Sequence, residues 1–359
     1  MHIVADQTPT DEDSAGLGAA VDWALAAKAG IKLAPSGPPM SRYTLETATA
    51  ELADASERAE LPVRAVTGLA DGLPVPAADV LDRAGWVRAA SRSMAHLTGA
   101  DPDGNGKLLL GKPAGLQAGA MLAYLSSAIL GQYDPFTGEH GKLLLVTPNI
   151  VTVERSLRLN PSDFRLWVCL HEVTHRVQFS SSPWLAGYMK ESVDTLGATV
   201  EEPMTDVVGR IAAQLRSRGE PDSGSDAAAG GIIGLLRASQ PEPQRDALDR
   251  MLVLGTLLEG HADHVMDAVG PDVVPSVVAI RAAFDRRRRR TSNPVQRLIK
   301  MLLGMDAKMA QYVRGKAFVD AVVLKVGMDN FNTVWTGPET LPLLDEIDDP
   351  GAWVTRVLG

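Results

Sequence analysis

Apolar residues recur along most of the chain at the three- and four-residue spacing of an amphipathic helix. In the first part of the chain the helices predicted from this spacing cover residues 19–28, 41–60, 76–98 and 113–131. The alternation typical of strands is rare, and the best strand candidate is Lys142–Thr147. The pattern therefore predicts a mainly α fold with a small β element, of the α+β class.

Two later helices are predicted from their end signals. One begins at Asn160, a capping side chain that is followed by Pro161 and the acidic Asp163, and it runs to about Phe179. The other extends over residues 244–269 without an interior proline. A further helix between them is expected to end at residue 202, and helical spacing continues to about residue 327, after which we expect loops.

The domain organisation predicted from these elements is simple. Residues 1–16 are polar and acidic and are expected to be flexible, and residues 17–359 are expected to form one domain. Within it we expect a helical lobe over about 17–140 and a catalytic lobe over about 141–359. Residues 217–231 have the composition of a surface loop.

The composition narrows the classes of partner. An apolar share of 45% suffices for a large core, and a net charge of −9 argues against a nucleic-acid partner, since phosphate binding needs clustered Lys and Arg. The single cysteine, Cys169, excludes internal disulfides and cysteine-rich zinc modules, and its helical position favours the core.

The first residues lack the pattern of a secretory signal, and no apolar run reaches the roughly 18 residues that span a bilayer. These features predict a soluble, cytoplasmic protein with no membrane partner.

The segment His171–His175 contains the pattern H-E-x-x-H within the first of the two later helices. His171 and His175 are four residues apart, so both imidazoles leave one face of the helix and can bind one ion. Glu172 is one step round the helix, which places its carboxylate beside the metal, where it can accept a proton from a metal-bound water. The alternative is a chance match in which the histidines make ordinary hydrogen bonds in the core.

A third ligand is needed, because a catalytic zinc typically has three protein ligands and one open position. Glu259 is the first candidate, since it lies on the second long helix among apolar residues, and Asp263 is on the same face one turn later. His264 and then His261 are the alternatives. Zinc is therefore the expected cofactor.

Three stretches carry a resemblance to a known family. They are Leu130–Phe136, Trp167–His175 and Glu259–Asp267. Together they resemble the zincin-like metallopeptidase type-two family from about Val21 to the C-terminus, and Glu259 with Asp263 resembles the E-x-x-x-D pattern of gluzincins. Some members of the family carry a label that associates them with deazaflavin-coenzyme biosynthesis.

The resemblance implies a mostly helical zincin-like fold with zinc on His171, His175 and Glu259. It also implies that Glu172 is the catalytic base and that Asp263 holds a ligand histidine by its other ring nitrogen. We therefore expect a zinc-dependent hydrolase, most simply a metallopeptidase acting on peptides or proteins. The alternatives are a binding or scaffold protein with a structural or vestigial metal, and a zinc hydrolase of a small non-peptide amide.

Other candidates are weaker. Residues 101–106 resemble the start of a calcium loop, but Lys112 stands where a bidentate Glu is needed. Residues 106–112 match a phosphate loop, except that Pro113 replaces the Ser or Thr. Arg286–Arg290 is expected to be a solvated helix end or loop, and the alternative is a docking patch for an acidic partner or peptide. Whether Tyr188 or His264 stabilises an oxyanion stays open, as does the oligomeric state.

Overall fold

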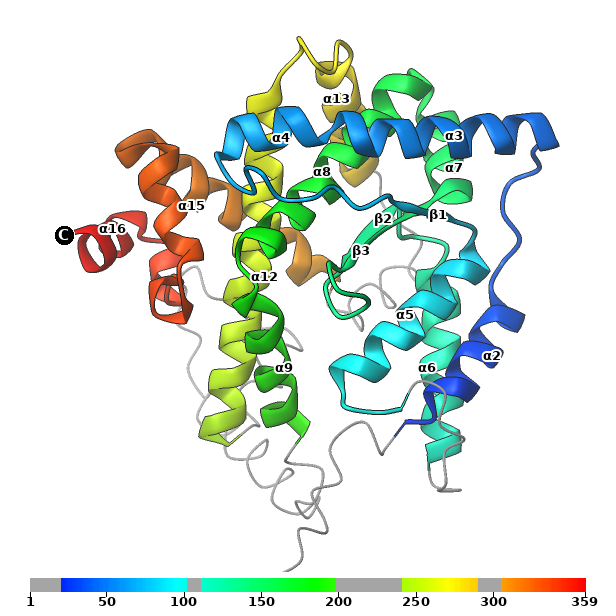
Figure 1. Cartoon of the computed structure of the whole chain (residues 1–359), viewed down its shortest axis with the longest axis horizontal. Helices are drawn as coiled ribbons and strands as arrows, with labels where there is room; N and C mark the ends of the chain where they lie inside the picture. Colours follow the sequence, from blue (N-terminus) through cyan, green and yellow to red (C-terminus); the bar gives the residue numbers. More distant parts are fainter. Residues whose placement is uncertain (1–20, 102–110, 198–240, 290–304) are drawn as a thin grey trace, which may run out of the picture.

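The computed structural model describes residues 21–101, 111–197, 241–289 and 305–359. Its α-helices are α2 (Trp23–Leu33), α3 (Arg42–Arg58), α4 (Glu60–Thr67), α5 (Arg83–Leu97), α6 (Gly111–Leu125), α7 (Thr147–Leu157), α8 (Pro161–Ser181), α9 (Trp184–Gly197), α12 (Glu242–Val269), α13 (Val277–Arg289), α15 (Met305–Phe331) and α16 (Pro350–Leu358). The strands are β1 (Asp79–Leu81), β2 (Gly131–Asp134) and β3 (Lys142–Val146), and short 3-10 helices are η1 (Asn332–Trp335), η2 (Pro338–Thr340) and η3 (Asp345–Ile347). The predicted mainly α fold with a small β element is confirmed (Figure 1).

The three strands form one sheet in the order β1-β3-β2, with β1 parallel and β2 antiparallel to β3. The side chains of β3 alternate between two cores. Leu143 and Leu145 pack with residues of α3, α4 and α8, while Leu144 and Val146 pack with residues of α5 and α6. Both faces are covered, and Leu143–Val146 form an uninterrupted apolar run, as is typical of strands buried on both sides.

Two of the three strands are not predicted from the sequence. The strand β1 lies within the helix predicted over 76–98, and β2 lies where no strand is predicted. The predicted helix over 76–98 begins only at Arg83, since Asp82 caps it by accepting a hydrogen bond from the backbone N–H of Gly85, and β1 precedes the cap. The strand β2 follows the end of α6 after a short turn. The pairing of β2 with β3 also crosses residue 140, so a boundary between lobes there would cut through the sheet.

The helix α8 lies at the centre of the molecule and has the predicted start. The side chain of Asn160 accepts a hydrogen bond from the backbone N–H of Asp163, and Pro161 occupies the first turn. The helix then runs to Ser181, two residues beyond the predicted end, and is buried along most of its length. It packs against the sheet on one side and crosses α12 on another (Figure 1).

Two glycines allow α12 to pack closely against α15. An added Cβ on Gly260 would lie 2.2 Å from the carbonyl carbon of Gly315, and one on Gly315 would lie 2.1 Å from the carbonyl oxygen of Thr256. The two backbones are therefore in direct contact next to Glu259. Apolar residues of α9, α12, α15, η1 and α16 form a second core around this crossing.

The end of the chain differs from the loops expected there. A kink at Gly327, with φ of +83°, is followed by a further helical turn to Phe331. The terminal helix α16 begins at Pro350 after Asp349, whose side chain accepts from the backbone N–H of Ala352. Residues 1–16 and 217–231, for which flexibility and a loop are predicted, lie outside the described part, as does the predicted helix end at residue 202. Among the described helices, none has the length and apolar character that crossing a bilayer requires.

Candidate metal centre

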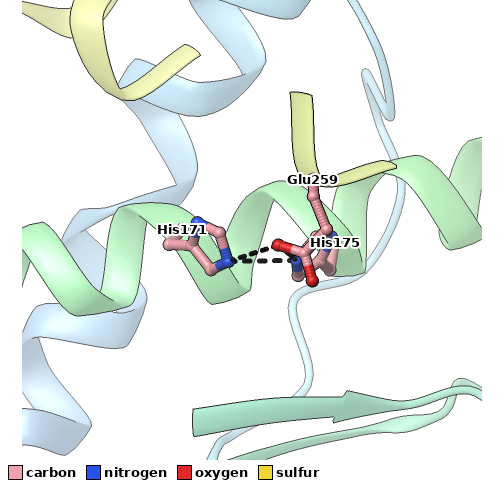
Figure 2. Close-up of side chains that lie close together, drawn as sticks. All are labelled: His171, His175 and Glu259. Atoms are coloured by element: carbon pink, nitrogen blue, oxygen red, sulfur yellow. Dashed lines mark hydrogen bonds and ion pairs between the residues drawn. The ribbon is translucent and has the colours of Figure 1, made fainter. Parts of the chain in front are cut away.

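Three side chains from two helices converge at the crossing of α8 and α12. His171 and His175 extend from one face of α8, and Glu259 reaches them from α12 (Figure 2). The Nε2 atoms of the two histidines are 3.2 Å apart, and Oε2 of Glu259 is 3.3 Å from Nε2 of His171 and 3.7 Å from Nε2 of His175. One donor atom from each residue lies within 4.8 Å of the others. Two imidazole nitrogens and a carboxylate oxygen are the donor set of a catalytic zinc site.

The electrostatics of this cluster suit a cation. Burial lowers the pKa of His175, but the hydrogen bond and negative charge of Glu259, with the charge of Glu172, outweigh it and raise the pKa to about 9. Burial raises the pKa of the Glu259 carboxyl, but its contacts with His171 and His175 hold it well below the ordinary value. A proton on His175 thus supplies positive charge that a metal ion can replace, with release of the proton. The residues present therefore fit zinc.

Glu172 is buried and lies against β2. An added Cβ on Gly131 would be 2.5 Å from Cγ of Glu172 and 2.9 Å from its Oε1, so the side chain fits only because residue 131 is glycine. The carboxylate is close enough to His175 to raise its pKa, yet it is not part of the three-residue cluster. This position beside the cluster is the one that a general base needs.

Gln178, one turn after His175, connects the two helices. Its Oε1 is 2.9 Å from Nδ1 of His175, and its Nε2 is 3.0 Å from the carbonyl oxygen of Leu258 and 2.9 Å from Nδ1 of His261. His261 is fully buried, and burial with the nearby positive charges of His264 and His175 lowers its pKa to about 3. His261 thus lies behind Gln178 rather than among the three donor residues.

Asp263 is not where the sequence pattern places it. Its carboxylate accepts a hydrogen bond from Nη1 of Arg281, which also pairs with Asp267. The expectation that Asp263 holds a ligand histidine is thus replaced by an ion pair between α12 and α13. His264, the other alternative ligand, has its Nδ1 2.6 Å from Oδ1 of Asp320 on α15.

The other candidate residues from the sequence analysis are not part of the three-residue cluster. Tyr188 packs edge-on against Trp184 and under the guanidinium of Arg250. Cys169 is fully buried, and burial raises the pKa of its thiol above the ordinary value. Arg286 is exposed on α13, while the side chains of the following arginines and the glycine-rich residues 102–110 lie outside the described part.

The sequence reasoning missed two residues of the centre. Gly131 lies within the stretch Leu130–Phe136 that carries the family resemblance, but its effect depends on contact with a helix some 40 residues later. Gln178 follows His175 by three residues, so its position on the same helical face was a usable signal. What the spacing could not supply is that Gln178 faces Leu258, 80 residues away.

The chain belongs to the zincin-like metallopeptidase family, whose model matches residues 21–354. It is similar over nearly its whole length to one solved structure, a protein from Chloroflexus aurantiacus described as "a putative hydrolase with a novel fold". The two share 31% sequence identity and superpose with a TM-score of 0.65 over 94% of this chain and 98% of the other. A search of curated proteins gives no match.

Proposed function

We propose that this protein is a zinc-dependent hydrolase that cleaves peptide bonds, with zinc held by His171, His175 and Glu259. The observation that carries the proposal is the convergence of these three donors from two helices, with the charge of the buried Glu172 acting on His175. Membership of the zincin-like metallopeptidase family and similarity to a structure described as a hydrolase support it.

In this mechanism Glu172 moves the proton. Zinc in such a site supplies a Lewis acid that polarises a carbonyl and brings the pKa of water toward about 7. The Glu172 carboxylate accepts the proton of the attacking water and then donates it to the leaving amine. Its burial against Gly131 limits the positions that the carboxylate can take.

The position of β2 at the edge of the described sheet supports a peptide as the substrate. The backbone N–H of Val146 donates to the carbonyl of Leu130, so residues 130, 132 and 134 of this antiparallel pair face β3. The backbone groups of Gly131 and Tyr133 therefore face away from β3, on the edge strand of the described sheet and beside Glu172. An extended peptide that pairs with this edge would present a backbone carbonyl to the centre.

Metal content and cleavage test the proposal together. The purified protein should contain about one zinc per chain, and His171→Ala and Glu259→Ala should each lose most of it. Wild type should cleave components of a mixed peptide library, read by mass spectrometry. Glu172→Gln should keep zinc and fold while losing about 10²–10⁴-fold in rate, the range that general acid–base catalysis contributes.

Two results would contradict this function. Equal cleavage by wild type and Glu172→Gln would remove Glu172 from the mechanism. A fully zinc-loaded wild type that cleaves no peptide would reject the peptidase, and a screen of small amides would then separate a non-peptide hydrolase from a binding protein.

A further inference from the structure

Gln178 lies on α8, and its side chain contacts His175 on the same helix and Leu258 and His261 on α12. We propose that Gln178 is a positioning residue: it sets the ring orientation and tautomer of His175 and fixes the spacing of α8 and α12, the role that the sequence pattern gives to Asp263. The inference rests on the proposed zinc site but not on the choice of substrate.

The orientation of the Gln178 amide follows from the backbone of α12. The carbonyl oxygen of Leu258 can only accept a hydrogen bond, so the Gln178 atom 3.0 Å from it must be the amide nitrogen. The second N–H of that nitrogen points to Nδ1 of His261, 2.9 Å away, which accepts it. The amide oxygen is then left on the side of His175.

This orientation decides the state of His175. An amide oxygen can only accept, so Nδ1 of His175, 2.9 Å from it, must carry a hydrogen. In the neutral imidazole the lone pair is then on Nε2, the atom that faces His171 and Glu259. The carbonyl of Leu258 thereby selects, through Gln178, the metal-binding tautomer of a residue on another helix.

The same contacts hold Gln178 in one place. Its side chain is fully buried, so a polar atom left without a partner would cost free energy. Both of its polar atoms have partners: Oε1 makes one hydrogen bond and Nε2 makes two. His261 is fixed in turn, since its ring packs 5.4 Å from Phe331 and 5.3 Å from Trp335. Because Leu258 precedes Glu259, the bond to its carbonyl also sets how far the third donor residue stands from α8.

Zinc affinity, measured by competition with a fluorescent chelator, tests the proposal. Gln178→Met keeps the volume and removes all three hydrogen bonds, and it should weaken zinc binding about 10–100-fold, as is typical when a partner of a ligand histidine is lost. Thr174→Val is the matched control, since it removes a buried hydrogen bond within α8 that does not reach α12. Asp263→Asn is the second control. Both controls should bind zinc like wild type.

Gln178→Glu separates positioning from a merely structural link. Its carboxylate still accepts from His175 but faces the Leu258 carbonyl without a donor. The Gln178→Glu protein should therefore unfold at a lower temperature than wild type and yet bind zinc more tightly than Gln178→Met. Zinc binding no better than that of Gln178→Met would overturn the role of the amide oxygen.

A spectroscopic readout is independent of activity. In zinc-loaded wild type the Nδ1–H of His175 should give a ring N–H resonance that exchanges slowly with water, and in Gln178→Met this resonance should exchange fast. Unchanged exchange together with wild-type zinc affinity would refute the proposal. If wild type binds zinc and shows the slow resonance but cleaves no peptide, the peptidase proposal fails while the role of Gln178 stands.

Discussion

The contact between Gly131 and Glu172 predicts that adding a single methyl group at residue 131 strongly lowers the rate of cleavage. In Gly131→Ala the new Cβ would lie 2.5 Å from Cγ of Glu172, whereas carbon atoms in contact are about 3.5–4.0 Å apart. The blocking atoms belong to a side chain, so the fold can persist while Glu172 moves by about 1 Å. A misplacement of about 1 Å can cost about 10²-fold in rate. Gly131 has no positive φ, so the effect is steric and not one of backbone strain.

The assay is kcat/KM on the best peptide from the library, together with zinc content. Gly131→Ala should lose about 10²-fold in kcat/KM and keep about one zinc per chain, because none of the three donors is touched. Gly187→Ala is the control, since an added Cβ there meets nothing within 4 Å. Wild-type kcat/KM in Gly131→Ala, with Glu172→Gln still inactive in that background, would refute the steric argument.

Further predictions concern the supports of the centre. Gly260→Ala pushes a Cβ into the backbone of Gly315, which cannot rotate away, and should destabilise the protein by at least about 1–3 kcal/mol and lower zinc affinity, measured by thermal unfolding and chelator competition. Gly255→Ala on the same helix meets nothing within 4 Å and should be neutral or stabilising by up to about 1 kcal/mol; equal effects of the two changes would contradict the close crossing. The hydrogen bond with Arg356 lowers the pKa of Glu346 below its ordinary value of 4.5, against the opposite effect of burial. This pair therefore stabilises the fold fully above that value and less as the pH falls through the folded pKa, so Glu346→Gln should flatten the loss of melting temperature in acid.

Features that depend on neighbouring residues could be predicted from the sequence. The start of α8 needs only Asn160, Pro161 and Asp163, and the shared face of His171 and His175 follows from helix geometry alone. The end of α12 is similarly local, since Gly270 with φ of +71° follows its last residue. These signals placed both helices within a few residues.

Features that depend on which helix packs opposite could not be predicted from the sequence. Helical spacing shows that Asp263 shares a face with Glu259, but the cation that meets it is Arg281, which the packing of α13 supplies. The short strand β1 has three residues and exists only because β3 pairs with it. The same limit applies to Gln178, whose neighbours were predictable along its own helix and not across to α12.

The β2–β3 ladder has a consequence for any attempt to produce the centre as a fragment. A polypeptide that starts at residue 141 would keep His171, His175 and Glu259 but lack both partners of β3. Both edges of an apolar strand would then be open, and Leu144 and Val146 would lose the helices that cover them. Such a strand is a template for aggregation. The part from residue 141 onward is thus expected to aggregate when it is produced alone, and co-expression with residues 1–140 is expected to restore a soluble fold by complementation.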